Sequence, residues 1–159
     1  MNKTTLVRKI IAALHDEVNS YARAARAAHA EATDPQSKAE NKYDTRGLEA
    51  AYLASAQSRQ AAETQAAIEA FEKLTVKTFK LTDAIDLSAL VELEARGERT
   101  SFFIAPCKGG LEVRVGRTEV MLITPQAPLG QQMVGRKCGE KFKWGSGAAA
   151  VDYKIAAVS

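Results

Sequence analysis

The chain has 159 residues, 46% of them hydrophobic, and a formal net charge of +3 at pH 7. This composition is typical of a folded protein with one ordinary domain or two small ones, and so small a charge does not indicate nucleic-acid binding. No run of about 18 apolar residues is present, and Asp16 and Glu17 come too early for a secretory signal. We therefore expect a cytoplasmic protein with no membrane span, in which Cys107 and Cys138 are reduced thiols.

Up to Leu74 the sequence is rich in alanine and predicts two helices. Small residues allow two helix axes to approach closely, so the expected product is an antiparallel helical hairpin, or coiled coil, over residues 1–74. The expected inner face of the first helix is Leu6, Ile10, Leu14, Val18, Tyr21, Ala25 and Ala28. The expected inner face of the second is Leu48, Tyr52, Ala62, Ala66, Phe71 and Leu74, although Ser55 and Arg59 interrupt it.

The two helices are separated by a polar stretch near residues 33–47, called the tip below. Pro35 disfavours helix in the preceding residue, and Ser37 with Glu40 three residues later forms a capping-box pattern for the second helix. Carboxylates are common at a helix start because they complement its dipole, so these acids alone need no further role. Together with amide, phenol and guanidinium groups, however, they predict a contact surface made of Asp34, Glu40, Asn41, Tyr43, Asp44 and Arg46.

Residues 75–159 alternate apolar and polar side chains in short segments separated by glycine-rich turns, which predicts a small antiparallel β domain. The expected strands are 74–79, 88–93, 100–106, 111–116, 118–124, 140–145 and 152–158. A short helix over 129–134, ended by Gly135, interrupts them. The overall fold class is thus α+β, with most aromatic side chains of the β domain in its core: Phe102, Phe103, Phe142, Trp144 and Tyr153.

No catalytic motif is visible, so we do not expect an enzyme. His15 and His29 are about 21 Å apart along one helix and cannot share a metal ion. The excess of basic over acidic residues lies entirely after residue 74, and Arg136 and Lys137, just past the short helix, are expected to be solvated.

The order of these elements resembles the Gre family of bacterial transcription elongation factors. The resemblance covers nearly the whole chain. It lies in the acidic hairpin and in the segments Pro128-Leu129-Gly130, Val134-Gly135-Arg136-Lys137, Gly139-Glu140 and Tyr153-Lys154-Ile155. It implies an FKBP-like second domain and a monomer that binds core RNA polymerase without sequence-specific DNA contacts. The polymerase-binding residues of that domain would be Leu129, Gly130, Arg136 and Lys137.

The resemblance further implies that the tip enters the secondary channel of the polymerase. There Glu40 and Asp44 would help to hold a Mg²⁺ ion shared with the polymerase, since Mg²⁺ prefers carboxylate and water oxygens. No cofactor is expected on the chain alone. The family tip reads Asp-x-x-Glu-Asn, whereas this chain has Ser37 in place of the first acid and retains Glu40 and Asn41.

Ser37 offers no anionic oxygen, so two roles remain open: stimulation of transcript cleavage, or inhibition of the polymerase by a non-catalytic factor. Two further alternatives are a coiled-coil adaptor that packs on another helical protein and a peptidyl-prolyl isomerase. The isomerase requires an aromatic-lined concave pocket in the β domain.

Overall fold

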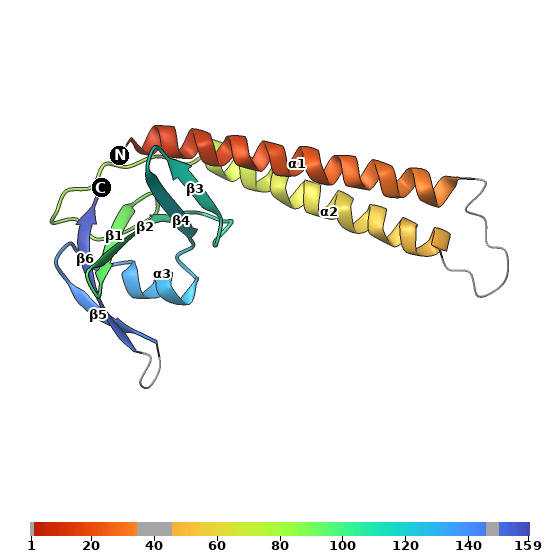
Figure 1. Cartoon of the computed structure of the whole chain (residues 1–159). Helices are drawn as coiled ribbons and strands as arrows, with labels where there is room; N and C mark the ends of the chain where they lie inside the picture. Colours follow the sequence, from red (N-terminus) through yellow and green to blue (C-terminus); the bar gives the residue numbers. More distant parts are fainter. Residues whose placement is uncertain (1, 35–45, 146–149) are drawn as a thin grey trace. The chain divides into compact units, whose positions relative to one another are not determined.

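The computed structural model describes residues 2–34, 46–145 and 150–159 (Figure 1). Two long helices are followed by a sheet and a short helix, which confirms the α+β fold expected from the sequence. The elements are α1 Lys3–Thr33, α2 Arg46–Glu72, β1 Leu90–Ala95, β2 Glu98–Ile104, β3 Glu112–Val115, β4 Thr118–Ile123, α3 Pro128–Met133, β5 Lys141–Trp144 and β6 Val151–Val158. Within the described residues, no helix is long and apolar enough to cross a membrane.

The chain forms two compact units. One contains residues 11–69, the larger parts of α1 and α2, and is called the hairpin unit below. The other contains residues 1–10 and 70–159 and is called the sheet unit. The first turns of α1 are thus grouped with the sheet, and the division at residue 74 drawn from composition stays a prediction about domains.

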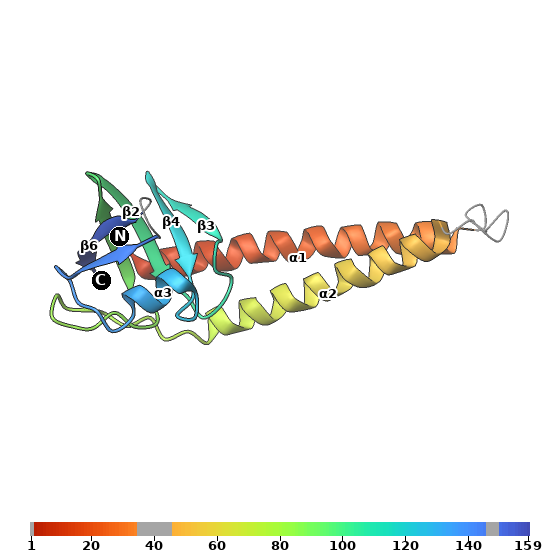
Figure 2. The same cartoon turned by 90° about the horizontal axis from the view of Figure 1, so that it is seen from below.

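In the hairpin unit α1 and α2 run side by side in opposite directions, as both views show (Figures 1 and 2). The predicted inner face of α1 is confirmed. Leu14 and Ala28 are buried, and the predicted positions between them are half-buried: Val18, Tyr21 and Ala25. Large and small apolar residues alternate with charged ones along α1, so its pattern identifies one face.

The predicted inner face of α2 is wrong at four of its six positions, because Leu48, Tyr52, Ala62 and Ala66 are all exposed. It is confirmed at the end of the helix, where Phe71 is buried and Leu74 half-buried. The less exposed positions follow a four-three spacing instead, typical of a coiled-coil seam: Ala50, Ala54, Gln57, Ala61, Thr64 and Ile68. Alanine occurs on every side of α2, so the sequence pattern cannot distinguish the inner side from the outer ones. The seam is made largely of small or polar side chains.

The described residues form one sheet of six strands in the order β3-β4-β2-β1-β6-β5. Four neighbouring pairs are antiparallel, as expected, but β2 and β4 pair in parallel, with Phe103 opposite Leu122. The last strand of the chain, β6, lies inside the sheet between β1 and β5. The bonds between Leu90 and Ser159 extend its pairing with β1, because each backbone N–H donates to the other residue's carbonyl at 2.9 Å.

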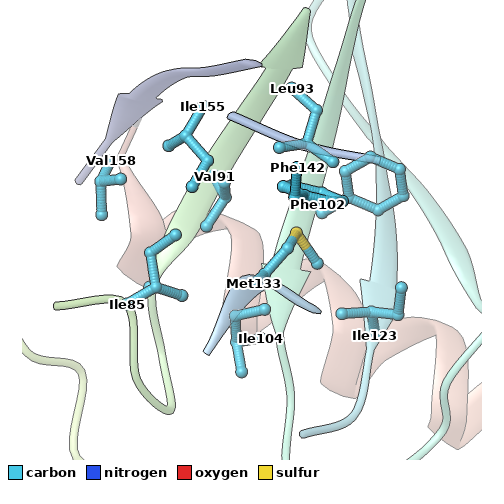
Figure 3. Close-up of a cluster of buried hydrophobic side chains, with 11 residues drawn as sticks. Ile85, Val91, Leu93, Phe102, Ile104, Ile123, Met133, Phe142, Ile155 and Val158 are labelled. Carbon is cyan, nitrogen blue, oxygen red and sulfur yellow. The ribbon is translucent and has the colours of Figure 1, made fainter. Parts of the chain in front are cut away.

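The main core of the sheet unit lies on one face of the sheet, where Met133 of α3 packs among strand residues (Figure 3). The buried members of this cluster are Ile85, Ala89, Val91, Leu93, Phe102, Ile104, Ile123, Met133, Phe142, Ile155 and Val158. The expected burial of the aromatic side chains is largely confirmed, since Phe102, Phe103 and Phe142 are buried and Trp144 and Tyr153 half-buried.

The opposite face of the sheet is also covered in part. Phe103 and Leu122 alternate with residues of the main core and are nevertheless fully buried. In the same unit Leu6 and Ile10 of α1 are fully buried, and Lys9 Nζ donates to the carbonyl of Arg114 on β3 at 2.9 Å. The start of α1 therefore packs on this second face.

The segment 74–79, predicted as a strand, is an irregular connection outside the sheet. Its backbone forms a hydrogen bond with a side chain instead of with a neighbouring strand: the N–H of Lys77 donates to the hydroxyl of Ser88 at 2.9 Å. Phe79 packs partly buried against the main core. Alternating apolar residues in this segment thus reflect contact with the core rather than strand pairing.

Candidate partner-binding site

The tip is described only at its two ends. Asp34 and Arg46 are both exposed, whereas the predicted contact residues Glu40, Asn41, Tyr43 and Asp44 lie outside the described residues. The predicted capping box of Ser37 and Glu40 lies outside them as well, and the described part of α2 begins at Arg46.

Asp34 follows the last turn of α1, where the Thr33 hydroxyl donates to the carbonyl of His29 at 2.9 Å. No basic residue lies in this last turn, and Glu31 is a further acid in it. The carboxyl end of a helix carries partial negative charge and disfavours acids. Helix stabilisation therefore does not account for Glu31 and Asp34, unlike an acid in a first turn.

Three large apolar side chains lie exposed on the first turns of α2. Leu48 is 56% exposed, Tyr52 69% and Leu53 52%. Leu48 and Tyr52 are one turn apart on one side of the helix, with Leu53 next to them, and we call these three residues the α2 apolar cluster. Sequence reasoning placed two of them inside the hairpin, so it missed this surface, although an apolar trio just after the tip was visible in the sequence.

Two of the predicted polymerase contacts in the sheet unit have structural roles. Gly130 is buried in α3, and a Cβ atom there would lie 2.0 Å from the carbonyl oxygen of Thr124. Leu129 packs partly buried against the main core. The Pro-Leu-Gly segment that carries the resemblance therefore also fits the close packing of α3 on the segment that follows β4.

Arg136 is half-buried rather than solvated. Its Nε donates to the carbonyl of Gln132 at 2.6 Å, and its guanidinium lies 5.4 Å from the centroid of the Phe142 ring. Lys137 is exposed as expected, while its backbone N–H donates to Glu140 Oε2 at 2.8 Å. Of the four predicted contacts in the sheet unit, Lys137 alone is exposed. The binding role of all four stays a prediction.

The described part of the chain contains no group of three acidic, histidine or cysteine side chains that could hold a metal ion. Asp34 alone of the acids proposed around the tip belongs to that part. Glu40 and Asp44, the residues expected to hold a shared Mg²⁺ ion, lie outside that part, so the metal site stays a prediction.

A hollow of about 220 Å³ lies over the sheet strands β1, β2 and β6. Tyr153 is the one aromatic side chain among its lining residues Leu93, Ala95, Arg96, Glu98, Thr100, Val151 and Tyr153. Pockets for small ligands usually measure about 300–1,000 Å³ and are mainly apolar. This hollow gives the isomerase alternative no support.

No family model and no curated protein matches the chain. Among solved structures, "GreA factor homolog 1 (Gfh1)" of Thermus thermophilus is 19% identical, with 94% of each chain covered and a TM-score of 0.39. Thermus aquaticus Gfh1 is 18% identical, with 98% of this chain and 92% of the other covered and a TM-score of 0.39. The GreA/GreB elongation factor of Nitrosomonas europaea is 16% identical, with 62% of this chain and 78% of the other covered and a TM-score of 0.39.

Proposed function

We propose that this chain is a regulator of bacterial RNA polymerase whose tip enters the secondary channel. The single observation that carries the proposal is the α2 apolar cluster, because it adjoins the tip and is exposed at 52–69%. Together with the resemblance in sequence, this exposure supports the end of the hairpin unit as the contact surface.

The energetic reason concerns water. Exposed apolar surface costs roughly 25 cal/mol per Å², and covering it by a partner recovers that free energy. Tyrosine is also enriched at the centre of protein interfaces, because its ring buries a large area while its hydroxyl can still donate a hydrogen bond. Leu48 and Tyr52 therefore supply affinity, whereas the polar tip residues supply specific contacts.

Tip carboxylates give this contact a chemical role. Glu40 and Asp44 would hold the shared Mg²⁺ together with groups of the polymerase, and the bound ion would activate water for phosphodiester cleavage. Because Ser37 lacks an anionic oxygen, the chain provides a weaker ligand set than an acid at that position would. We therefore propose regulation of elongation as the principal activity and cleavage stimulation as a minor one.

Co-purification and transcription test the proposal. Full-length protein should retain core RNA polymerase at modest salt, and it should alter elongation by backtracked complexes. Leu48→Asn/Tyr52→Asn should reduce the effect on elongation about tenfold, a loss that corresponds to roughly 1.4 kcal/mol. Leu81→Asn is the matched control, because Leu81 is 69% exposed but belongs to the sheet unit. The proposal is contradicted if the protein does not retain polymerase. It is also contradicted if Leu48→Asn/Tyr52→Asn and Leu81→Asn reduce the effect on elongation equally.

A coiled-coil adaptor is the second candidate, since the α2 apolar cluster could equally receive a helix of another protein. The two candidates differ at the acids. Glu40→Ala/Asp44→Ala should abolish the effect on transcription if the tip acts in the polymerase, and should leave an adaptor's partner binding intact.

A further inference from the structure

The outer strand β5 exposes a pair of lysines along an open sheet edge. β5 ends the strand order, so no strand formed by the described residues lies beside it on the side away from β6. Lys141 and Lys143 are exposed on one face, whereas Phe142 is buried and Trp144 half-buried on the other. Strand periodicity thus divides this edge into a basic face and an aromatic face.

The backbone of the same two lysines points to the open side. Ile155 N–H donates to the carbonyl of Glu140 at 2.9 Å, and the register places Lys141 opposite Lys154. Hydrogen-bonded and non-hydrogen-bonded pairs alternate in an antiparallel ladder. Lys141 and Lys143 therefore occupy the non-hydrogen-bonded positions, and their N–H and C=O groups are directed away from β6.

The charge on this edge is not neutralised within the sheet. Lys141 and Lys154 are direct cross-strand neighbours, an arrangement that destabilises a sheet when the charges are alike. Glu94, on the other side of Lys154, is engaged by Arg99 at 3.2 Å. In the part of the chain that the structure describes, none of Lys141, Lys143 and Lys154 forms an ion pair, although Asp152 lies opposite Lys143.

We propose that the open edge of β5 binds an extended acidic segment of another protein as an added strand. Its acidic residues, at every second position, face Lys141 and Lys143, and its apolar residues lie beside Trp144. An added strand satisfies the outward N–H and C=O groups alike, whereas a phosphate backbone offers only acceptors and leaves the carbonyls unpaired. Lysines on a sheet edge disfavour the addition of most strands. A strand with acidic side chains is the exception, because its charges are opposite to those of the lysines.

The test uses the full chain and a fluorescein-labelled synthetic peptide that alternates glutamate and valine. Fluorescence anisotropy should show saturable binding that weakens as salt rises, because the contacts are between exposed charges. A peptide that alternates lysine and valine is the charge control and should not bind. Lys141→Gln/Lys154→Gln should weaken binding of the glutamate peptide about tenfold. Lys80→Gln, an exposed lysine away from β5, should leave it unchanged.

Backbone pairing is tested separately by Lys143→Pro, compared with Lys143→Ala. Proline at an outward-facing position removes no hydrogen bond to β6. It does remove the backbone N–H that would donate to an added strand, and its ring obstructs that strand. Binding should be weaker in the proline variant than in the alanine variant, at equal melting temperature. If the proline variant has a lower melting temperature than the alanine variant, the test of the proposal is the binding measured with Lys141→Gln/Lys154→Gln.

Three results overturn the proposal. One is equal binding of the lysine and glutamate peptides. Another is unchanged binding after Lys141→Gln/Lys154→Gln. The third is binding of a single-stranded oligothymidylate but not of the glutamate peptide, which assigns the lysines to nucleic acid. Because no polymerase is present, the outcome is independent of the function proposed for the hairpin unit.

Discussion

The hydroxyl of Ser88 accepts a hydrogen bond from the backbone N–H of Lys77 at 2.9 Å and so fixes the connection between α2 and the sheet. Ser88 is fully buried and has a φ of 69°, a left-handed conformation that is costly for a residue other than glycine. Its carbonyl also accepts from Lys3 Nζ at 3.2 Å. One strained residue thus joins the start of α1, the connection and the sheet.

Ser88→Ala should destabilise the sheet unit by about 1–3 kcal/mol, because it leaves the Lys77 N–H without its acceptor and retains the strain. Ser88→Gly loses the same bond but relieves the conformation, so it should cost less than the alanine variant. Urea unfolding of both variants measures the difference. A glycine variant less stable than the alanine variant would show that φ at this position carries no strain.

Gly130→Ala should destabilise the protein by about 1–3 kcal/mol, because the new Cβ would meet the Thr124 carbonyl oxygen at 2.0 Å. Gly109→Ala is the matched control. Its nearest contact, Thr124 Cγ2 at 3.5 Å, is an ordinary van der Waals distance. Thermal unfolding should separate the two variants, and similar melting temperatures would mean that α3 moves without cost.

Gln57→Leu should stabilise the hairpin unit by about 0.5–1.5 kcal/mol, because Gln57 occupies a half-buried seam position of α2. Gln60→Leu introduces the same change at an exposed position and should have little effect. Far-UV circular dichroism during heating follows the helices directly. Equal effects of the two substitutions would contradict the seam assigned to α2.

Burial raises the pKa of the Cys107 thiol, and the charge of Lys108 lowers it by a smaller amount. Only the thiolate reacts with iodoacetamide. Its alkylation rate should therefore rise at a higher pH than that of a cysteine in an unfolded peptide, and denaturant should abolish the difference. Mass spectrometry of tryptic fragments reads Cys107 separately from Cys138. If the alkylation rate of Cys107 in the native protein rose at the same pH as in the peptide, or at a lower pH, the burial of this thiol would be contradicted.

The sequence sufficed to predict α1 because Leu14, Val18 and Tyr21 contrast with charged neighbours on its other sides. It also predicted the helix α2, but it failed to identify most of the inner face, because alanine surrounds this helix and packing rather than hydrophobicity selects the seam. The parallel pairing of β2 with β4 was equally hidden, since alternation identifies strands but not their neighbours. For the same reason the Lys141–Lys154 pair emerges only from the register. The tip acids were visible in the sequence, whereas the exposure of Leu48 and Tyr52 required the structure.

The interior position of β6 has a consequence for biosynthesis. Residues 11–69 leave the ribosome before the strands of the sheet do, and they form a compact unit of their own, so their helices can pair before the sheet is complete. The sheet cannot be completed then, because β1 waits for a partner more than fifty residues further along the chain. Until β6 emerges, β1 exposes a free edge, and nascent chains are most open to chaperones and to aggregation in that interval.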